Sequence, residues 1–198
     1  MTNEEELFER YLQELITWNE KFNLTAVTAP AEIKIRHFED SLSILQVIDL
    51  KDQKVVDIGS GAGFPGIPLK IVRPNISLVL MDSTRKKIDF LSHIIKELKL
   101  ENVNAVWGRA EELAKKPYYG RQFDIALARA IAKFPKLLLF ALPLLKKGGV
   151  FVAQKQEHVE QEINDSKLEL KKLGGKIRKI KKVVVGGIIR SLVVVEKV

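Results

Sequence analysis

The chain has 198 residues, of which 46% are hydrophobic and 29% are charged, proportions typical of a single globular domain of ordinary size. It contains no cysteine, which excludes disulfides, thiolate metal sites and a cysteine nucleophile. The sequence has neither an apolar run long enough to cross a membrane nor a secretory signal at its acidic start, so a cytoplasmic protein is expected.

The formal net charge of +8 is unevenly distributed along the chain. Residues 1–50 hold ten acidic and four basic side chains, so this segment carries −6 and the remainder carries +14. A basic body of this kind is typical of proteins that bind a polyanion such as nucleic acid. A lysine-rich solvated surface would give the same composition.

Residues 1–50 have the pattern of short helices that form a cap. Apolar residues recur at helical spacing over residues 4–22, and this first helix is expected to end at Asn23. A second helix is expected to begin near Pro30, because proline is tolerated in a first turn, and a third short helix to follow Ser41.

Over residues 51–198 the pattern changes to strands that alternate with helices, which predicts a core domain. Helical patterns over residues 86–98 and 135–145 lie between apolar runs, so parallel βαβ units in a doubly wound α/β sheet are expected. Two strand-like runs near the end, separated by Gly186-Gly187, predict a closing antiparallel pair. The seven predicted strands span residues 55–58, 77–81, 103–107, 123–128, 150–153, 176–185 and 191–196.

The strongest local signal is a glycine-rich loop between the first strand and a helix, Asp57-Ile58-Gly59-Ser60-Gly61-Ala62-Gly63-Phe64-Pro65-Gly66. Glycines allow a sharp turn and let a ligand approach main-chain N–H groups closely. The spacing Gly61-x-Gly63-x-x-Gly66 matches a dinucleotide fingerprint, but the Asp57 carboxylate would repel a pyrophosphate. The same carboxylate would attract the ammonium group of S-adenosylmethionine. The loop therefore favours S-adenosylmethionine over a nicotinamide dinucleotide.

Polar residues after the next two strands extend this candidate site. Asp82, followed by Ser83, ends the second strand, where a carboxylate can accept hydrogen bonds from ribose hydroxyls. It could instead be an acid at the helix N-terminus before Arg85. Ala110 and Glu111 follow the third strand, in the loop that holds the adenine edge in class I methyltransferases. Glu111 could equally be a first-turn helix acid.

Taken together, these motifs resemble the RsmG (GidB) family, which methylates guanine N7 in small-subunit ribosomal RNA. The resemblance runs from about Trp18 to Lys197. The family usually has serine where Ala128 stands, and Lys-Gly where this chain has Lys155-Gln156. The elements that carry the resemblance are Trp18-Asn19 with Asn23-Leu24-Thr25, Arg36-His37 with Asp40-Ser41-Leu42, the glycine loop continued to Ile67-Pro68-Leu69, Lys86-Lys87 with Phe90-Leu91, Gly108-Arg109-Ala110-Glu111-Glu112, and Ala128-Arg129-Ala130.

The resemblance implies a class I, Rossmann-like methyltransferase fold that uses S-adenosylmethionine, with 16S rRNA or the small ribosomal subunit as partner. It further implies methylation in the 530 loop near the decoding site, without a metal or a membrane. The expected cofactor contacts are Asp57, Gly59, Ser60, Gly61, Gly63, Phe64, Asp82, Ser83, Ala110, Glu111 and Arg129, and Arg129 is also the expected catalytic residue. The expected substrate contacts are Arg36, His37, Lys155 and Arg190.

Arg129 and His37 also have structural alternatives. Arg129 ends the fourth strand, at the carboxyl edge where ligands of α/β sheets bind, but a lone arginine there is often only a salt-bridge partner. His37 could serve the substrate side or packing, and His37, His93 and His158 have no metal-ligand spacing.

The residues that are missing also bear on the type of reaction. Methylation of cytosine C5 uses a cysteine nucleophile, and this chain has none. Methylation of the adenine amino group typically uses Asn/Asp-Pro-Pro-Tyr/Phe after the fourth strand, where this chain reads Leu127-Ala128-Arg129-Ala130. Guanine N7 has an in-plane lone pair and no proton, so direct in-line transfer needs positioning but no general base.

Two other functions compete with RNA methylation as interpretations of the sequence. The Asp57 carboxylate and the chain-wide resemblance oppose a nicotinamide-dependent oxidoreductase, and the intact glycine loop opposes a catalytically silent RNA-binding domain. Eight basic residues against two acidic ones between Asp165 and Lys182 predict contacts with RNA phosphates. Alternatively, these lysines only solvate a helix and an edge strand.

Overall fold

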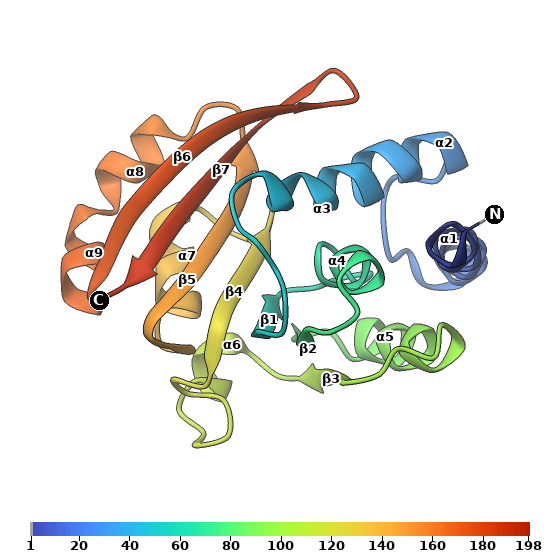
Figure 1. Ribbon diagram of the computed structural model, residues 1–198, viewed down its shortest axis with the longest axis horizontal. Coiled ribbons are helices and arrows are strands. Elements are labelled where there is room, and N and C mark those ends of the chain that lie inside the picture. Colours follow the sequence, from blue (N-terminus) through green and yellow to red (C-terminus); the bar gives the residue numbers. More distant parts are fainter. Residues whose placement is uncertain (1) are drawn as a thin grey trace.

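Seven strands form one sheet in the order β3-β2-β1-β4-β5-β7-β6 in the structure, a computed structural model that describes residues 2–198 (Figure 1). Strands β1 to β5 are parallel, and β7 lies antiparallel between β5 and β6. The predicted doubly wound, mostly parallel sheet of seven strands is thereby confirmed. The strands are β1 Lys54–Ile58, β2 Ser77–Asp82, β3 Val103–Trp107, β4 Phe123–Arg129, β5 Leu145–Gln156, β6 Gly175–Val185 and β7 Ile188–Lys197.

Helices cover both faces of the sheet and create two hydrophobic cores. Neighbouring side chains of a strand point to opposite faces, so Val55 of β1 packs in one core and Val56 in the other. Such strands are apolar along their whole length because both faces are covered. The helices after residue 50 are α4 Gly66–Val72, α5 Arg85–Glu97, α6 Ala110–Leu113, α7 Phe134–Ala141, α8 Glu160–Asp165 and α9 Lys167–Leu173.

Helix α5 illustrates how the sequence pattern produces the packing. Ile88, Leu91 and Ile94 recur three residues apart and are buried against the sheet. Burial of each such side chain contributes roughly 1.5–3 kcal/mol. Across the sheet, α7 buries Phe134, Leu137, Leu138 and Ala141 in the second core.

The N-terminal helix α1 spans Asn3–Phe22, close to its predicted range. Thr2 and Glu5 form a capping box that satisfies free N–H groups at its start, and Asn23 ends it in the left-handed conformation. The helix packs on α4 and α5 (Figure 1). No helix within residues 2–198 combines the length and apolar character that a membrane span requires.

The prediction of a separate third helix after Ser41 was wrong. One helical segment runs without a break through α2 (Pro30–Ile33), the π-helix η1 (Lys34–Glu39), α3 (Asp40–Leu42) and the 3₁₀-helix η2 (Ser43–Gln46). Asp40 and Ser41 resembled a helix start, but their side chains bond elsewhere. The Asp40 carboxylate binds residues of the sheet, and the Ser41 hydroxyl donates to the His37 carbonyl.

Two predicted boundaries in the second half of the chain also differ. The fifth strand, predicted over residues 150–153, spans Leu145–Gln156, and the helix predicted over 135–145 ends at Ala141. The segment after Leu142 turns at Pro143 into β5 instead of continuing the helix. The short helix α8 was not predicted, whereas α6 and α9 lie where the sequence offered a helix as an alternative, at Glu111 and among the lysines between Asp165 and Lys182.

Candidate active site

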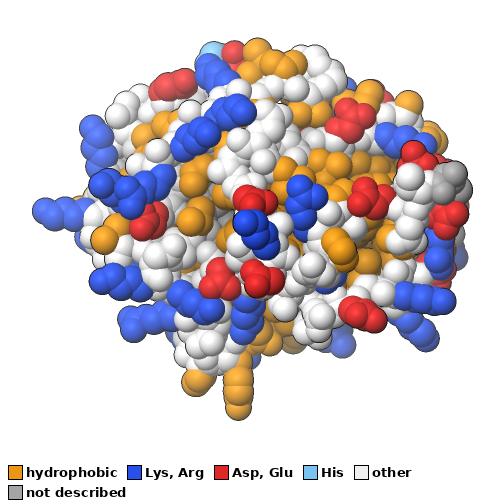
Figure 2. Space-filling model, viewed as in Figure 1, with side chains coloured by type: hydrophobic (Ala, Val, Ile, Leu, Met, Phe, Trp, Pro, Cys, Tyr) orange, Lys and Arg blue, Asp and Glu red, His pale blue; other side chains and the backbone are white. Residues whose placement is uncertain are grey.

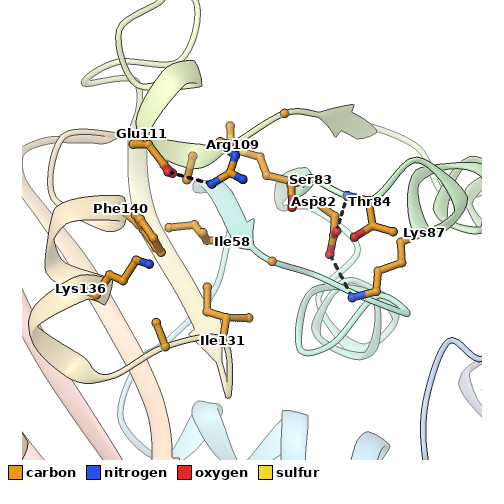
Figure 3. A pocket seen from close by; sticks show the side chains of 15 residues that line it. Ile58, Asp82, Ser83, Thr84, Lys87, Arg109, Glu111, Ile131, Lys136 and Phe140 are labelled. Atoms are coloured by element: carbon orange, nitrogen blue, oxygen red, sulfur yellow. Dashed lines mark hydrogen bonds and ion pairs between the residues drawn. The ribbon is translucent and has the colours of Figure 1, made fainter.

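A cavity of about 280 Å³, which we call the loop cavity, opens at the carboxyl ends of β1, β2 and β3. Figure 3 shows Lys136 and Phe140 of α7 on one side of it and Asp82 and Lys87 on the other. This edge is where ligands of open α/β sheets bind. Five residues predicted to bind the cofactor line the loop cavity, namely Gly59, Ser83, Asp82, Ala110 and Glu111.

The glycine loop needs glycine for backbone reasons at the points nearest this cavity. Gly59 has φ +66°, and a Cβ there would lie 2.6 Å from Cγ2 of Ile131. Gly61 has φ +61°, and a Cβ there would have no neighbour closer than 4.0 Å. A side chain at Gly61 would therefore be strained and would project into open space beside the loop.

Asp82 joins the end of β2 to the glycine loop. One carboxylate oxygen accepts the Gly61 N–H at 3.0 Å, and the other accepts the Thr84 N–H at 2.8 Å. Lys87 Nζ lies 3.8 Å from the same carboxylate (Figure 3). These contacts fix the loop next to a carboxylate that still lines the cavity.

Asp57 lies beneath the loop and does not line the loop cavity. Its side chain is fully buried, and Oδ2 accepts the Gly66 N–H at 2.9 Å. Burial raises the pKa of Asp57 to about 7. In this arrangement the carboxylate shapes the loop, whereas the sequence interpretation had it facing a ligand ammonium group. Ser60 is buried beside it and donates to the Asp57 carbonyl, and Gly63 packs against Ile67.

A second cavity of about 750 Å³, which we call the basic cavity, adjoins the first, and both are lined by Ile131 and Ala132. It gathers residues from η1, β4, β5 and β7. The four residues predicted to contact substrate line it together with Arg129: Arg36, His37, Lys155 and Arg190. The fold therefore brings together residues that are up to 154 positions apart in the sequence.

Arg129 is held firmly in the basic cavity. Its NH1 group donates to Asp40 Oδ2 and to the Arg36 carbonyl, both at 3.2 Å, and its guanidinium lies 5.0 Å from the Phe64 ring centroid. Burial lowers the pKa of Arg129, and the Asp40 charge acts in the opposite direction. Arg129 is thus both an ion-pair partner and part of the cavity wall.

His37 is a neutral ring packed beside Arg129. Its ring stacks on Phe64 with centroids 4.5 Å apart, and Nε2 lies 2.8 Å from the Thr25 hydroxyl. Burial, and then the Arg129 charge, lower the pKa of His37 to about 4. At neutral pH the imidazole therefore adds no charge to the cavity.

The other predicted substrate residues differ in how far their charged groups are already paired with other residues of the protein. Lys155 donates to the Ala132 carbonyl at 2.9 Å and pairs with Glu162 at 2.9 Å, so it anchors the segment between the two cavities. Arg36 is half exposed and lies 3.7 Å from Glu32. Within residues 2–198, Arg190 bonds only through its Nε, which donates to Asp40 Oδ1 at 3.1 Å.

Several residues of the site were missed by sequence reasoning. Lys136 and Phe140 line the loop cavity, and their four-residue spacing on α7 is the only sequence signal that they share a face. Asp40 and Gln154 line the basic cavity. Asp40 belongs to a motif that carries the family resemblance but had no assigned role, and no local pattern distinguishes Gln154. Within the described chain, no cluster of three or more His, Asp or Glu residues could hold a metal ion.

Comparison with known proteins places this geometry in a family. A family model described as rRNA small subunit methyltransferase G (GidB) matches residues 4–193. "Ribosomal RNA small subunit methyltransferase G" of Desulfitobacterium hafniense is 47% identical over 194 residues, which cover 97% of this chain and 80% of that protein.

Solved structures share the fold at lower identity. M. jannaschii TYW2 in complex with AdoMet matches with a TM-score of 0.62 and 20% identity, covering 82% of this chain and 76% of that one. A SAM-dependent methyltransferase from Aquifex aeolicus matches with a TM-score of 0.61 and 18% identity, covering 85% and 94%. These likenesses confirm the predicted fold class.

Proposed function

The chain belongs to the rRNA small subunit methyltransferase G family and is an S-adenosylmethionine-dependent methyltransferase, and we propose that it methylates N7 of a guanine in 16S ribosomal RNA. The observation that carries the proposal is the pair of adjoining cavities. One lies at the glycine loop, and the other has a cationic wall suited to an RNA nucleotide. The bound cofactor supplies an electrophilic methyl group.

The residues of the loop cavity fit a nucleoside ligand. The Asp82 carboxylate stands at the cavity wall as an acceptor for ribose hydroxyls, while Ser83, Ala110 and Glu111 line the same space. We propose that Gly59 and Gly61 allow close approach to the loop backbone. Asp57, Ser60 and Gly63 would act indirectly, by holding the shape of the loop from beneath. Arg129 would bound the site from the basic cavity, and Phe64, which lines neither cavity, would support it from beneath the guanidinium.

Transfer to N7 suits the charges in the basic cavity. The nucleophile holds no proton, so the reaction needs no general base. The pKa of His37 is lowered to about 4, which makes its ring a weak base, and Arg129 is a cation bonded to Asp40, so neither is suited to remove a proton. The N–H groups of Arg190 are donors, and guanine O6 beside N7 is an acceptor. We propose a guanine of the 530 loop near the decoding site, as the family resemblance implies, because an unstacked base can enter such a cavity.

We also propose that RNA phosphates lie along the edge strand β6. Lys and Arg side chains gather over the left part of the molecule in Figure 2, which Figure 1 shows to be formed by β6, β7, α8 and α9. Lys176 and Lys179 of β6 are exposed and have no ion-pair partner within residues 2–198. Lys182 lies 3.9 Å from Glu157 and 3.8 Å from Glu160, so its charge is partly compensated. Phosphate contacts of this kind position RNA without reading its sequence.

We further propose that residues 1–50 act as a cap on a cofactor-binding core formed by residues 51–198, within one structural domain. The Tyr11 hydroxyl of α1 donates to the Ala62 carbonyl in the glycine loop. Helix η1 supplies Arg36 and His37 to the basic cavity. The cap would therefore support the cofactor loop and complete the substrate side.

The direct test is methylation of 16S rRNA, free and within small ribosomal subunits, followed by mapping of the modified base. Strand scission specific to N7-methylguanine distinguishes this product from methylation at carbon or exocyclic nitrogen. The expected result is one modified guanine in the 530 loop. Methylation of another atom, or of RNA outside the small subunit, would contradict the proposal.

A further inference from the structure

A buried carboxylate, that of Asp40, links Arg129 and Arg190, two of the three arginines that line the basic cavity. Asp40 is 1% exposed. Its Oδ2 accepts from Arg129 NH1 at 3.2 Å, and its Oδ1 accepts from Arg190 Nε at 3.1 Å. Gln154 Nε2 donates to the same Oδ1 at 2.8 Å and to the Asp40 carbonyl at 2.7 Å.

These partners come from different parts of the fold. Arg129 ends β4 and Arg190 lies on β7, the two strands that flank β5, and Gln154 belongs to β5 between them. Asp40 reaches the three strands from the helical segment above them. One side chain therefore sets the relative positions of two guanidinium groups that no local sequence brings together.

The charges show why this carboxylate matters. Asp40 and Glu162 are the two acids among the residues that line the basic cavity, and Glu162 pairs with Lys155. Asp40 is thus the counter-charge of both arginines. Removing one member of a buried ion pair leaves the other uncompensated, which is strongly unfavourable.

Arg190 still has donors to offer to a ligand. Its side chain is 23% exposed, and its two terminal nitrogens have no hydrogen-bond partner in the described part of the chain. Because Asp40 fixes the Nε edge, the orientation of these terminal N–H groups in the cavity is fixed as well. A guanidinium held in this way is preorganised for a planar acceptor.

We propose that Asp40 is a positioning residue of the methyl-transfer site, which holds Arg129 in place and aims the terminal N–H groups of Arg190 at O6 of the guanine. This inference rests on the proposed function. With O6 held, N7 is directed toward the loop cavity. In the transfer the S–CH₃ bond breaks, its electron pair stays on sulfur, and the N7 lone pair forms the new N–CH₃ bond. The positive charge passes from sulfur to the purine, no proton leaves, and the Asp40 carboxylate lies among the arginines where this charge arrives.

The same arrangement discriminates between bases. Adenine presents an amino group where guanine presents O6, so Arg190 N–H groups would face another donor and both would stay unpaired. An RNA with 2,6-diaminopurine at the target position keeps N7 and replaces O6 with an amino group. It also turns the N1–H donor of guanine into an acceptor, so the contact that Asp40 is proposed to arrange is measured by how far Arg190→Lys changes the preference between the two bases.

The test compares three variants, Asp40→Asn, Arg190→Lys and the combination of both. The control is Asp49→Asn, which removes an exposed acid from the loop after the helical segment that holds Asp40. Asp40→Asn and Arg190→Lys should each lower kcat at least about tenfold, with the Kd for S-adenosylmethionine within about twofold of wild type. The double variant should fall little further than either single variant, because the two residues act as one unit. The preference for guanine over 2,6-diaminopurine should fall with Arg190→Lys, and Asp49→Asn should leave every quantity unchanged.

Full activity with unchanged base preference in Arg190→Lys would overturn the proposal, even if Asp40→Asn does not fold. Additive losses in the double variant would also overturn it. Failure of the proposed function is a separate outcome, because the wild-type enzyme would then fail to produce N7-methylguanine.

Discussion

The loop cavity and the basic cavity adjoin each other but are built in different ways. The loop cavity is shaped by backbone: glycines with positive φ, N–H groups tied to Asp82, and short segments that follow β1, β2 and β3. The basic cavity is formed by long charged side chains from distant segments, and the carboxylate of Asp40 orients two of them, Arg129 and Arg190. The first should therefore respond mainly to changes of backbone conformation, and the second to changes of charge.

Arg129→Ala should have the largest effect, because it removes a largely buried cation from the wall of the basic cavity, two residues before Ile131, which lines both cavities. We expect methyl transfer to fall by about 10³-fold, in line with the loss of a preorganised group at a reacting centre. Asp40 keeps Arg190 and Gln154 as partners, so the melting temperature should fall by only a few degrees. Single-turnover kinetics and thermal unfolding measure the two effects. Nearly full activity, or failure to fold, would show that Arg129 serves the fold alone.

Gly61→Val should weaken binding of S-adenosylmethionine by about a hundredfold, since valine is strained at φ +61° and projects beside the loop. The matched control is Gly148→Val. Gly148 also has a positive φ, +78°, and open space around it. It lies near the amino end of β5, whereas both cavities lie at the carboxyl ends of the parallel strands. Calorimetry should give wild-type affinity for Gly148→Val. Equal affinities in the two folded variants would remove the loop from the binding site.

The same contrast explains what could be predicted from sequence. Gly59, Asp82, Ala110 and Glu111 follow strands directly, and parallel strands bring their carboxyl ends to one edge, so a local motif was enough to group them. Asp40 could not be assigned in this way. It resembles a helix N-cap in sequence, and only the tertiary fold shows that its partners are Arg129 and Arg190.

Packing determines where the side chains of Asp57 and Lys155 point. The sequence placed both residues near the site but could not predict these directions. Asp57 has the expected position after β1, yet its carboxylate points beneath the loop to Gly66. Lys155 lies on the expected wall, yet its ammonium group is bound to Ala132 and Glu162. The direction of a side chain depends on which partner is available after packing, and the order of residues in a strand does not supply that information.

Asp57→Asn should change the pH dependence of stability, because burial raises the pKa of Asp57 to about 7 in the folded chain. The unfolded state then loses its proton first as pH rises from about 4, so the wild type loses stability between about pH 4 and pH 7. Asparagine cannot ionise. The free energy of unfolding of Asp57→Asn, relative to that of the wild type, should therefore increase by about 2 kcal/mol from pH 5 to pH 8. Urea unfolding of both proteins at the two pH values measures this gap. If the free energies of unfolding of the two proteins changed equally between the two pH values, ionisation of the buried Asp57 would not destabilise the fold.

Substitution of the edge-strand lysines should have the smallest effect of the four, and it extends the comparison beyond the cavities. Lys176→Gln/Lys179→Gln removes two exposed, unpaired charges of β6, and the expected result is about a tenfold loss of RNA affinity with a salt slope smaller by roughly 1–2 units. Adding Lys182→Gln should change little more, because Glu157 and Glu160 already lie near that lysine.

The matched control is Lys21→Gln/Lys96→Gln, which removes two exposed charges from α1 and α5, on the other side of the sheet from α7 to α9. Binding titrations across salt concentrations should show the wild-type slope for this pair. If both pairs behave alike, the lysines of β6 only solvate an exposed edge, where charge discourages strand pairing between molecules. The phosphate track would then have to lie elsewhere, with the face that holds Arg36, Arg85 and Lys86 as the next region to substitute. A reduced slope for the β6 pair alone would instead show that β6 contacts RNA phosphates outside the basic cavity. The basic cavity, where Asp40 orients the arginines, would then contact a single base.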